Sequence, residues 1–418
     1  MRVRLPEVRD WPVAGVLAAL ALVRIGVPLA VLAASGSSLL PGFPEYAYDA
    51  RPGDAHGYHA AVRELLSTPP RLSWAFPGVA LCAAALVVVL VRWRPRPLER
   101  PVLALVAVWC VGLIATLVVL RMRYSGAPTI GWPLVWSIPL FPYRALGLPL
   151  DPDVAFGFGL AVSLAANVVS LVSTYFLALW ATGRRAVGVV AASLFGFWPL
   201  LVLIVAKTGD VGTWTVDLGL SLYSEPVSTA LVTTGCALLV RRPTGPVAAA
   251  LAGALLGLSV TVRLSNAVVA AAVTALVALR GERQTALRVA AAGMAFLPVV
   301  LAYWPMGYES LPENTFRDDP FGLEYVVPAW RDSVLWGLTA FVALVPLAVA
   351  GTFAVPRRQA AFLWAWILAT LAFYTFYFYT PLHPRFLLVA LPAAFVLWGA
   401  GAVMLRDRAL YGSFMPRP

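Results

Sequence analysis

The 418-residue chain contains little charge and little cysteine. Charged residues make up 12% of it, hydrophobic residues make up 61%, and the mean hydropathy is +0.82. Soluble domains carry about 25% charged residues, so this composition excludes the soluble classes. The three cysteines, Cys82, Cys110 and Cys236, all lie in apolar runs, which argues against a disulfide framework or a cysteine metal site.

No segment has the length and composition of a soluble domain. The longest segments between apolar runs are residues 35–74, 121–153 and 306–332. The first apolar run lacks a convincing small-residue cleavage site, so we expect a retained helix rather than a signal peptide. The sequence therefore predicts a single membrane domain over residues 1–418 and no soluble domain.

Long apolar runs recur along the whole chain. About twelve of them have roughly 18–25 residues, enough for a helix to cross the ~30 Å hydrocarbon core of a bilayer. The expected spans are 11–34, 74–91, 101–120, 154–181, 186–206, 222–240, 245–262, 264–279, 288–305, 333–354, 359–379 and 386–405. We therefore expect an all-α, polytopic integral membrane protein with about twelve transmembrane helices.

Arginines cluster in alternate connections between these runs. The clusters are Arg92, Arg94, Arg96 and Arg100; Arg184 and Arg185; Arg241 and Arg242; Arg280, Arg283 and Arg288; Arg357 and Arg358; and Arg406 and Arg408. The positive-inside rule makes these connections and both termini cytoplasmic, in a multi-pass protein of the plasma membrane. Of the 20 acidic residues, 15 fall at or near the opposite face. We therefore expect the outer face to carry the function.

The net charge of +11 could indicate a nucleic-acid partner. Most of the arginines, however, lie in short inner loops, where membrane topology alone explains them. The sequence thus predicts a lipid bilayer as partner, and no nucleic acid.

The first outer loop, 35–73, carries the most informative pattern. A helix over about 55–66 has one apolar stripe with i, i+3, i+4, i+7 spacing, typical of an interfacial helix. The stripe consists of Tyr58, Ala61, Val62, Leu65 and Leu66. Asp54 begins this helix, where a carboxylate can act as a base at the membrane surface or simply cap the helix. Asp49, in the same loop, is a second candidate.

A metal at this loop is a weaker prediction. His56 and His59 could hold a divalent cation beside Asp54, but a His-x-x-His pair in a solvated helix is a weak signal. We assign no metal ligand, and a divalent cation is the one cofactor left open.

Three charged residues at outer helix ends are candidates for substrate binding. Glu225 precedes Pro226 at the start of a span. It could simply belong to the first turn of a helix, or it could be an acid that faces a polar cavity. Arg263 lies in a very short turn and Arg385 begins the last span. Either guanidinium could snorkel to lipid headgroups or bind a phosphate.

Three other outer segments have plainer interpretations. The proline-punctuated residues 131–142 suit a re-entrant or interfacial segment that could wall a lipid-facing cavity. The acidic outer loop 306–332 could act as a lid over an acceptor site. The aromatic residues of 373–379 match an interfacial belt, and we assign them no chemistry.

Together, four motifs resemble those of the GT-C glycosyltransferases, in the branch of the protein O-mannosyltransferases and the lipid A aminoarabinose transferase. They are Gly53 to Tyr58, Ser224 to Pro226, Gly257 to Arg263, and His383 to Phe386. Members of that branch often have an Asp-Glu pair in the first outer loop. Here Asp54 matches the first acid, Ala55 replaces the second, and Tyr58 matches the aromatic residue that follows.

The resemblance implies a GT-C-like fold and an enzyme that transfers a hexosyl or pentosyl group. The donor would be a sugar on a polyprenyl phosphate, and the acceptor a lipid, glycan or protein hydroxyl at the outer membrane face of the cell envelope. Asp54 would be the catalytic base and the reaction would invert the anomeric carbon. The implied substrate-binding residues are Tyr58, Glu225, Arg263, His383 and Arg385.

Two other functions fit parts of the sequence. About twelve spans also suit a secondary transporter, but apart from Arg24 the notable charges lie at helix ends, and two matching halves with broken spans are not evident. A lipid-glycan ligase or polymerase would share the substrate class. It would need a long outer loop late in the chain, and 306–332 is short for that.

Overall fold

The computed structural model describes residues 11–34, 62, 131–148, 152–205, 224–297, 300, 321–333, 339–377 and 384–411. Within these ranges every named element is a helix, and the β contact is an isolated bridge between Phe321 and Tyr377. The all-α class predicted from the sequence is therefore confirmed. Val62, from the predicted interfacial helix, is helical and buried.

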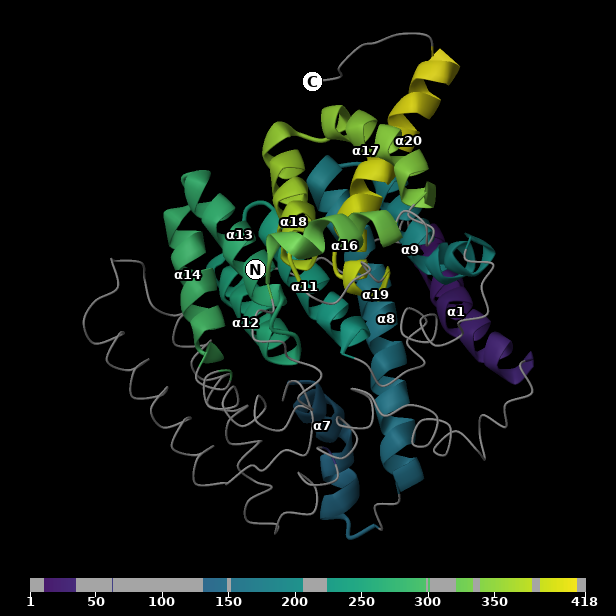
Figure 1. Ribbon diagram of the computed structural model, residues 1–418, viewed down its shortest axis with the longest axis vertical. Helices are drawn as coiled ribbons and strands as arrows, with labels where there is room; N and C mark the ends of the chain where they lie inside the picture. The colour runs from purple at the N-terminus through teal and green to yellow at the C-terminus, as the bar shows by residue number, and fades with distance from the viewer. Residues whose placement is uncertain are drawn as a thin grey trace.

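Figure 1 shows the helices as a bundle. They are α1 (Trp11–Ala34), α7 (Gly131–Ala145), α8 (Pro152–Thr182), α9 (Arg185–Val205), α11 (Glu225–Val240), α12 (Pro246–Val262), α13 (Asn266–Leu279), α14 (Arg283–Met294), the 3-10 turn η2 (Leu323–Tyr325), α16 (Val326–Ser333), α17 (Thr339–Ala354), α18 (Arg357–Thr375), α19 (Pro384–Leu387) and α20 (Leu391–Tyr411).

One helix in the described ranges is both long and apolar enough to cross a membrane, the stretch Gly157–Thr182 of α8. Six shorter apolar helical stretches, of 10–17 residues, accompany it. The predicted spans 74–91 and 101–120 lie outside the described residues. The described helices therefore leave the predicted count of about twelve spans unsupported, because most of them are shorter than a full span.

Several predicted spans coincide with helices to within a few residues. The run 154–181 forms α8, 245–262 forms α12, and the first run forms α1 with both ends as predicted. Three predictions were wrong in their limits. Helix α14 begins at Arg283 rather than at 288, α17 begins at Thr339 rather than at 333, which still belongs to α16, and the last predicted span is divided into α19 and α20.

Glycines end two of these helices at the predicted arginine loops. Gly281 follows α13 with φ +84°, and the next two backbone bonds, Gly281 N to Ala278 O (3.0 Å) and Glu282 N to Val277 O (3.3 Å), form a Schellman motif. Gly183 ends α8 in the same left-handed region, with φ +70°. Glycine adopts this conformation without the cost that a Cβ would bring, so the sequence stops both helices there.

Small residues also let pairs of helices pack closely. A Cβ placed at Gly253 or Gly257 of α12 would collide with the backbone of α14 at Val289 or Gly293. A Cβ at Gly351 of α17 would collide with the backbone of α20. Such backbone-to-backbone approach is typical of small-residue interfaces between apolar helices.

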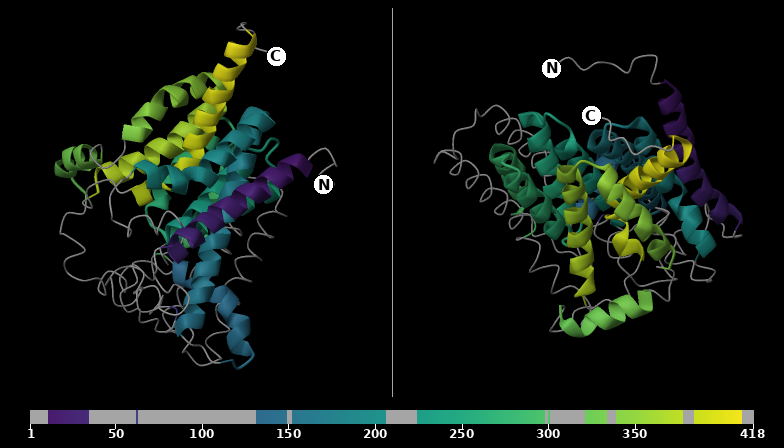
Figure 2. Two further views of the ribbon diagram at one scale, coloured as in Figure 1. Left: turned by 90° about the vertical axis from the view of Figure 1, so that its right-hand side faces the viewer. Right: turned by 90° about the horizontal axis from the view of Figure 1, so that it is seen from above.

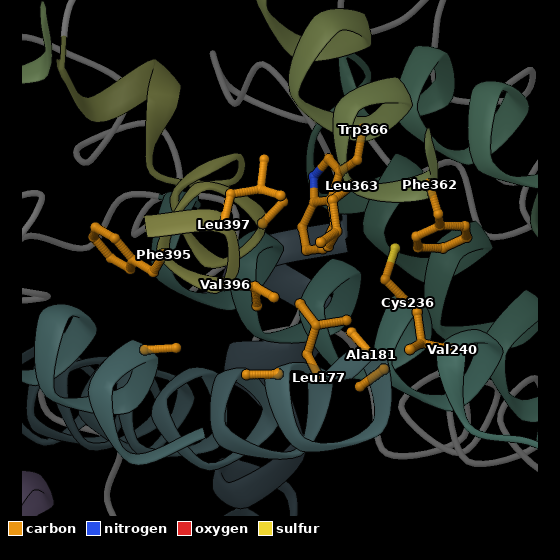
Figure 3. Packing of buried hydrophobic residues seen from close by; sticks show 14 of the residues in the cluster. Leu177, Ala181, Cys236, Val240, Phe362, Leu363, Trp366, Phe395, Val396 and Leu397 are labelled. Carbon is orange, nitrogen blue, oxygen red and sulfur yellow. The ribbon is translucent and has the colours of Figure 1, made fainter. Parts of the chain in front are cut away.

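The main hydrophobic core lies between α8, α11, α18 and α20. Figure 3 shows Leu177 and Ala181 of α8 facing Cys236 of α11, with Phe362 and Trp366 of α18 above them. Cys236 is buried and not in a disulfide, in keeping with its expected role as a small apolar residue.

The bundle has two distinct ends. The arginine end lies where α8, α11, α13 and α17 finish and α9, α12, α14 and α18 begin, and Arg184 there pairs with Asp407 of α20. This end is uppermost in Figure 1, and the left view of Figure 2 also places the C-terminal end of α20 there. At the opposite end, α11 begins with Glu225 and α12 finishes before Arg263.

Candidate functional site

Glu225 begins α11 at the end of the bundle opposite the arginine loops. Pro226 follows in the first helical turn, where its missing N–H costs no helix hydrogen bond. The Glu225 residue is only 5% exposed. A carboxylate this deeply buried is unstable as an ion unless a cation or hydrogen-bond donors surround it.

Arg263 supplies that cation from the turn between α12 and α13. It is the C-cap of α12, with an extended backbone at φ −152° and ψ 113°. Its N–H bonds to Ser259 O at 2.8 Å, and its carbonyl accepts from Asn266 N at 3.0 Å. Because α13 begins at Asn266, the turn is only three residues long, and it fixes the Arg263 backbone between the end of α12 and the start of α13.

The two charges form a buried ion pair. Arg263 Nη1 lies 2.5 Å from Glu225 Oε1, and the two side chains are 16% and 5% exposed. Burial is the largest single influence on Arg263 and would lower its pKa, but the charges and hydrogen bonds of Glu225 and Tyr374 together outweigh burial and raise that pKa above its ordinary value. The Arg263 guanidinium therefore stays protonated beside Glu225.

Two hydroxyls hold the guanidinium from its other edge. Arg263 Nε donates to Tyr374 Oη at 2.8 Å and lies 3.3 Å from Ser265 Oγ. The two hydroxyls are themselves hydrogen-bonded at 2.7 Å. Tyr374 comes from the last turn of α18, so one arginine joins α11, the α12–α13 turn and α18.

Aromatic rings line the face of the same guanidinium. Phe386 of α19 stacks on Tyr374 with a centroid distance of 4.8 Å and an interplanar angle of 3°. Arg263 Cζ lies 5.0 Å from the Phe386 centroid and 5.6 Å from the Tyr374 centroid. Both distances suit cation–π attraction, which strengthens when the cation is desolvated.

Helix α16 packs against this aromatic pair. Ala329 is fully buried in one cluster with Tyr374, Phe386 and Leu387. In the segment that precedes α16, Gly322 N donates to Phe376 O at 3.0 Å. The carboxyl half of the predicted lid loop therefore lies against the Arg263 site, and Figures 1 and 2 show α16 across the end of α18.

Asn266 forms a polar layer beneath Glu225. Its Nδ2 donates to Ser228 Oγ at 2.7 Å and to Ser259 O at 3.0 Å. Its Oδ1 is buried without a hydrogen-bond partner in the described part of the chain, as is Oγ1 of Thr229, the residue after Ser228. Buried acceptors of this kind commonly bind an internal water.

Helix α7 packs on the same end of α12. A Cβ at Gly131 would collide with the backbone of Thr261 and Val262, immediately before Arg263. Trp136 is buried, donates to Ala155 O of α8 at 2.7 Å and stacks on Trp132 at 5.5 Å. The segment predicted to be re-entrant or interfacial is thus a helix that adjoins the site.

The structure brings together two of the six predicted site residues. Glu225 and Arg263 are in direct contact, and Arg385 belongs to α19, directly before Phe386. Asp54, Tyr58 and His383 lie outside the described residues, as do His56 and His59.

Sequence reasoning missed four contributors: Ser265, Asn266, Tyr374 and Phe386. Tyr374 was assigned to an aromatic belt because six aromatic residues crowd the end of that run. Only the contact with an arginine 111 residues away distinguishes it from its neighbours. Ser265 and Asn266 could have been found from the polar run that follows Arg263.

A second buried polar cluster surrounds Arg24 of α1. The Arg24 residue is 1% exposed, and its Nη2 donates to Asn167 Oδ1 at 2.8 Å and its Nη1 to Phe195 O at 3.2 Å. Its guanidinium also lies 4.7 Å from the Phe195 ring centroid. Arg24 therefore joins α1 to both α8 and α9.

Metal-ligating groups do not gather in the described ranges, where no three His, Cys, Asp or Glu residues lie close enough to hold an ion. Comparison of the chain with protein families, with curated proteins and with solved structures finds no match. The chemistry of the Arg263 site is therefore the basis for assigning a function.

Proposed function

We propose that the chain is a membrane glycosyltransferase of the GT-C type. It transfers a sugar from a polyprenyl-phosphate carrier to a hydroxyl of a lipid, glycan or protein at the outer face of the plasma membrane. The observation that carries the proposal is the convergence of Glu225, Arg263, Tyr374 and Phe386 from four separate segments. Buried charges at the end of an apolar bundle usually mark a functional site.

The membrane location rests on composition and on charge distribution. The chain is 61% hydrophobic, and helix α8 contains an apolar stretch long enough to cross a bilayer. About twelve spans are part of the proposal, with residues 74–91 and 101–120 among them. The arginine end faces the cytoplasm by the positive-inside rule, so the Arg263 end faces outward.

The reaction we propose is a single displacement. Asp54 accepts the proton of the acceptor hydroxyl, whose oxygen attacks the anomeric carbon as the bond from that carbon to the phosphate oxygen breaks. The polyprenyl phosphate leaves as an anion and the configuration inverts. A phosphate leaving group needs charge stabilisation more than it needs a proton, which is the role of Arg263 and Arg385.

The ion pair refines the role of Glu225. Its carboxylate bonds Arg263 Nη1 while Tyr374 and Ser265 hold Nε, so the guanidinium is oriented before any substrate binds. Such preorganisation avoids a reorganisation cost during the reaction. Glu225 is then a positioning residue for Arg263, whereas Tyr58 and His383 contact the sugar or acceptor.

The testing experiment is sugar transfer by the purified protein in lipid. A panel of radiolabelled polyprenyl-phosphate sugars is supplied as donors, and label is followed to an acceptor or to water. Wild type should transfer label from one donor, Asp54→Asn should transfer none, and Asp49→Asn should match wild type. Arg263→Gln should lower kcat by roughly 10²-fold or more, as loss of one electrostatic contact to a leaving group commonly does.

Full activity in Asp54→Asn would remove Asp54 as the base. Absence of turnover with every donor, together with substrate uptake by proteoliposomes that needs no lipid-linked sugar, would favour transport instead.

Transport is the second candidate because of Arg24, whose buried guanidinium lies within an apolar helix. Intramembrane charges of this kind mark substrate pathways in transporters. Arg24→Gln should then abolish uptake, whereas it should leave sugar transfer chemistry unaffected.

A further inference from the structure

Three arginines lie at the arginine end of the bundle, on the turns after α11 and α13 and at the start of α18. Arg280 Nη2 donates to the carbonyl of Arg358, and the Arg280 guanidinium lies 5.1 Å from the Phe362 ring centroid. Arg242 Nη2 donates to Glu282 Oε1 at 2.7 Å. We call Arg242, Arg280 and Arg358 the arginine triad.

The triad has an excess of positive charge. Burial and the positive charge of Arg242 lower the pKa of Arg280 to about 10, with a further contribution from Arg358 against the opposing effect of Glu282. Like charges held this close repel one another, and Glu282 balances only one of them. A bound anion would relieve the repulsion.

Hydrogen-bond donors are also available to an anion. Arg280 Nε is buried and has no partner among the described residues. Helix α18 also begins beside the triad, with Pro356 as its N-cap and no acidic residue in its first turn, whereas Glu282 is the N-cap residue of α14. The N-terminal dipole of α18 therefore adds to the positive potential.

Two apolar side chains near the triad in the sequence are exposed. Leu279, directly before Arg280, is 83% exposed, and Phe353, in the last turn of α17, is 80% exposed. A free phosphate ion would gain nothing from these two side chains. An amphiphile would contact them with its acyl chains while its headgroup reached the arginines.

We propose that the arginine triad binds the headgroup phosphate of an anionic phospholipid. Arg280 and Arg358 contact the phosphate oxygens, and Leu279 and Phe353 contact the acyl chains. The site lies where α13 ends and α18 begins, at the end of the bundle opposite the start of α11 (Figure 1). This inference depends on the proposed membrane location and is independent of sugar transfer.

The test is lipid retention by the purified full-length protein, measured by native mass spectrometry. Phosphatidylglycerol and phosphatidylcholine with identical acyl chains are titrated separately, without any sugar donor. Wild type should retain phosphatidylglycerol in preference to phosphatidylcholine. Each lost arginine charge should weaken phosphatidylglycerol binding about fivefold, so Arg280→Gln/Arg358→Gln should weaken it about 25-fold.

The matched control is Arg406→Gln, which removes an exposed arginine that pairs with Asp407 at the same end and should leave retention unchanged. Arg280→Lys/Arg358→Lys should keep most of the binding because it keeps both charges. Helicity and monodispersity report folding, and should the double glutamine variant fail to fold, Arg358→Gln alone should still show the fivefold loss.

Equal retention of the two lipids, or equal phosphatidylglycerol binding by wild type and the glutamine variants, would overturn the proposal. Displacement of the lipid by millimolar inorganic phosphate would instead identify a site for a free anion. Because no sugar donor is present, failure of this test leaves the transferase proposal intact, and failure of sugar transfer leaves the lipid site intact.

Discussion

The two ends of the bundle hold the same kind of ion pair in different surroundings. At one end, the Glu225 and Arg263 side chains are 5% and 16% exposed and are enclosed by Tyr374 and Phe386. At the other, Arg242 and Glu282 are 44% and 28% exposed. A buried charge cannot regain its solvation if its partner is lost, whereas an exposed charge can. Burial, and not the presence of a pair, therefore distinguishes the candidate site from a charged helix end.

Removal of one charge of the buried pair should have the largest effect on stability. Glu225→Gln leaves the Arg263 guanidinium buried without its carboxylate, which should lower the free energy of unfolding by about 3–5 kcal/mol. Denaturant unfolding in mixed micelles measures the change. The double variant Glu225→Gln/Arg263→Gln should recover most of the loss, since no unpaired charge remains. A double variant as unstable as the single one would contradict this account.

Removal of the Tyr374 hydroxyl should lower the free energy of unfolding by less than removal of the Glu225 charge. Tyr374→Phe keeps the ring that stacks on Phe386 but removes the oxygen bonded to Arg263 Nε and Ser265 Oγ. The expected loss is about 1.5–3 kcal/mol, the range for a hydrogen bond to a charged group. Tyr143→Phe on α7, whose ring contacts Phe158, serves as the control. If transfer activity is present, Tyr374→Phe should lower kcat more than it alters KM, because it loosens a preorganised cation.

The exposed pair at the arginine end should contribute little. Arg242→Gln removes the partner of Glu282, and we expect the free energy of unfolding to fall by no more than about 1 kcal/mol. Raising the salt concentration should shrink even this difference, whereas it should leave the Glu225→Gln effect nearly unchanged. A loss as large as that of Glu225→Gln would mean that the two ends do not differ as their exposure indicates.

The smallest expected effect on stability is that of Asp407, and it should depend on pH. Hydrogen bonds from Arg184 and then Arg406 hold the pKa of Asp407 below its ordinary value of 3.8. A carboxyl group whose pKa is lower in the folded state than in the unfolded state stabilises the fold at pH values above its ordinary pKa. That stabilisation is lost as the pH falls through the lowered pKa. The stability difference between wild type and Asp407→Asn should therefore be constant at neutral pH and should shrink only once the pH falls below 3.8, through the lowered pKa of Asp407. A difference that persisted in acid would show that the side-chain amide itself disturbs the helix end.

The apolar runs predicted the ends of the helices well where a residue next to the run, such as a glycine, terminates the helix. Helix α13 stops just before Gly281 and α8 just before Gly183, and each of these left-handed glycines is flanked by an arginine cluster. The start of α14 at Arg283 was missed because arginine, read as a loop residue by its charge, is also a good helix former. The break between α19 and α20 has a local signal that the apolar run conceals, because Pro392 lies in the first turn of α20, where proline favours a helix start.

The sequence by itself determined that the chain is helical and apolar, and that arginine clusters lie in alternate connections between its apolar runs. These properties follow from composition, hydrophobic run length and terminating glycines, which act over a few residues. It also singled out Glu225 and Arg263 as charges that needed an explanation. Only the tertiary structure decided that they pair with each other and that Tyr374 and Phe386 enclose them, because contacts between residues 38 to 123 positions apart depend on how the helices pack.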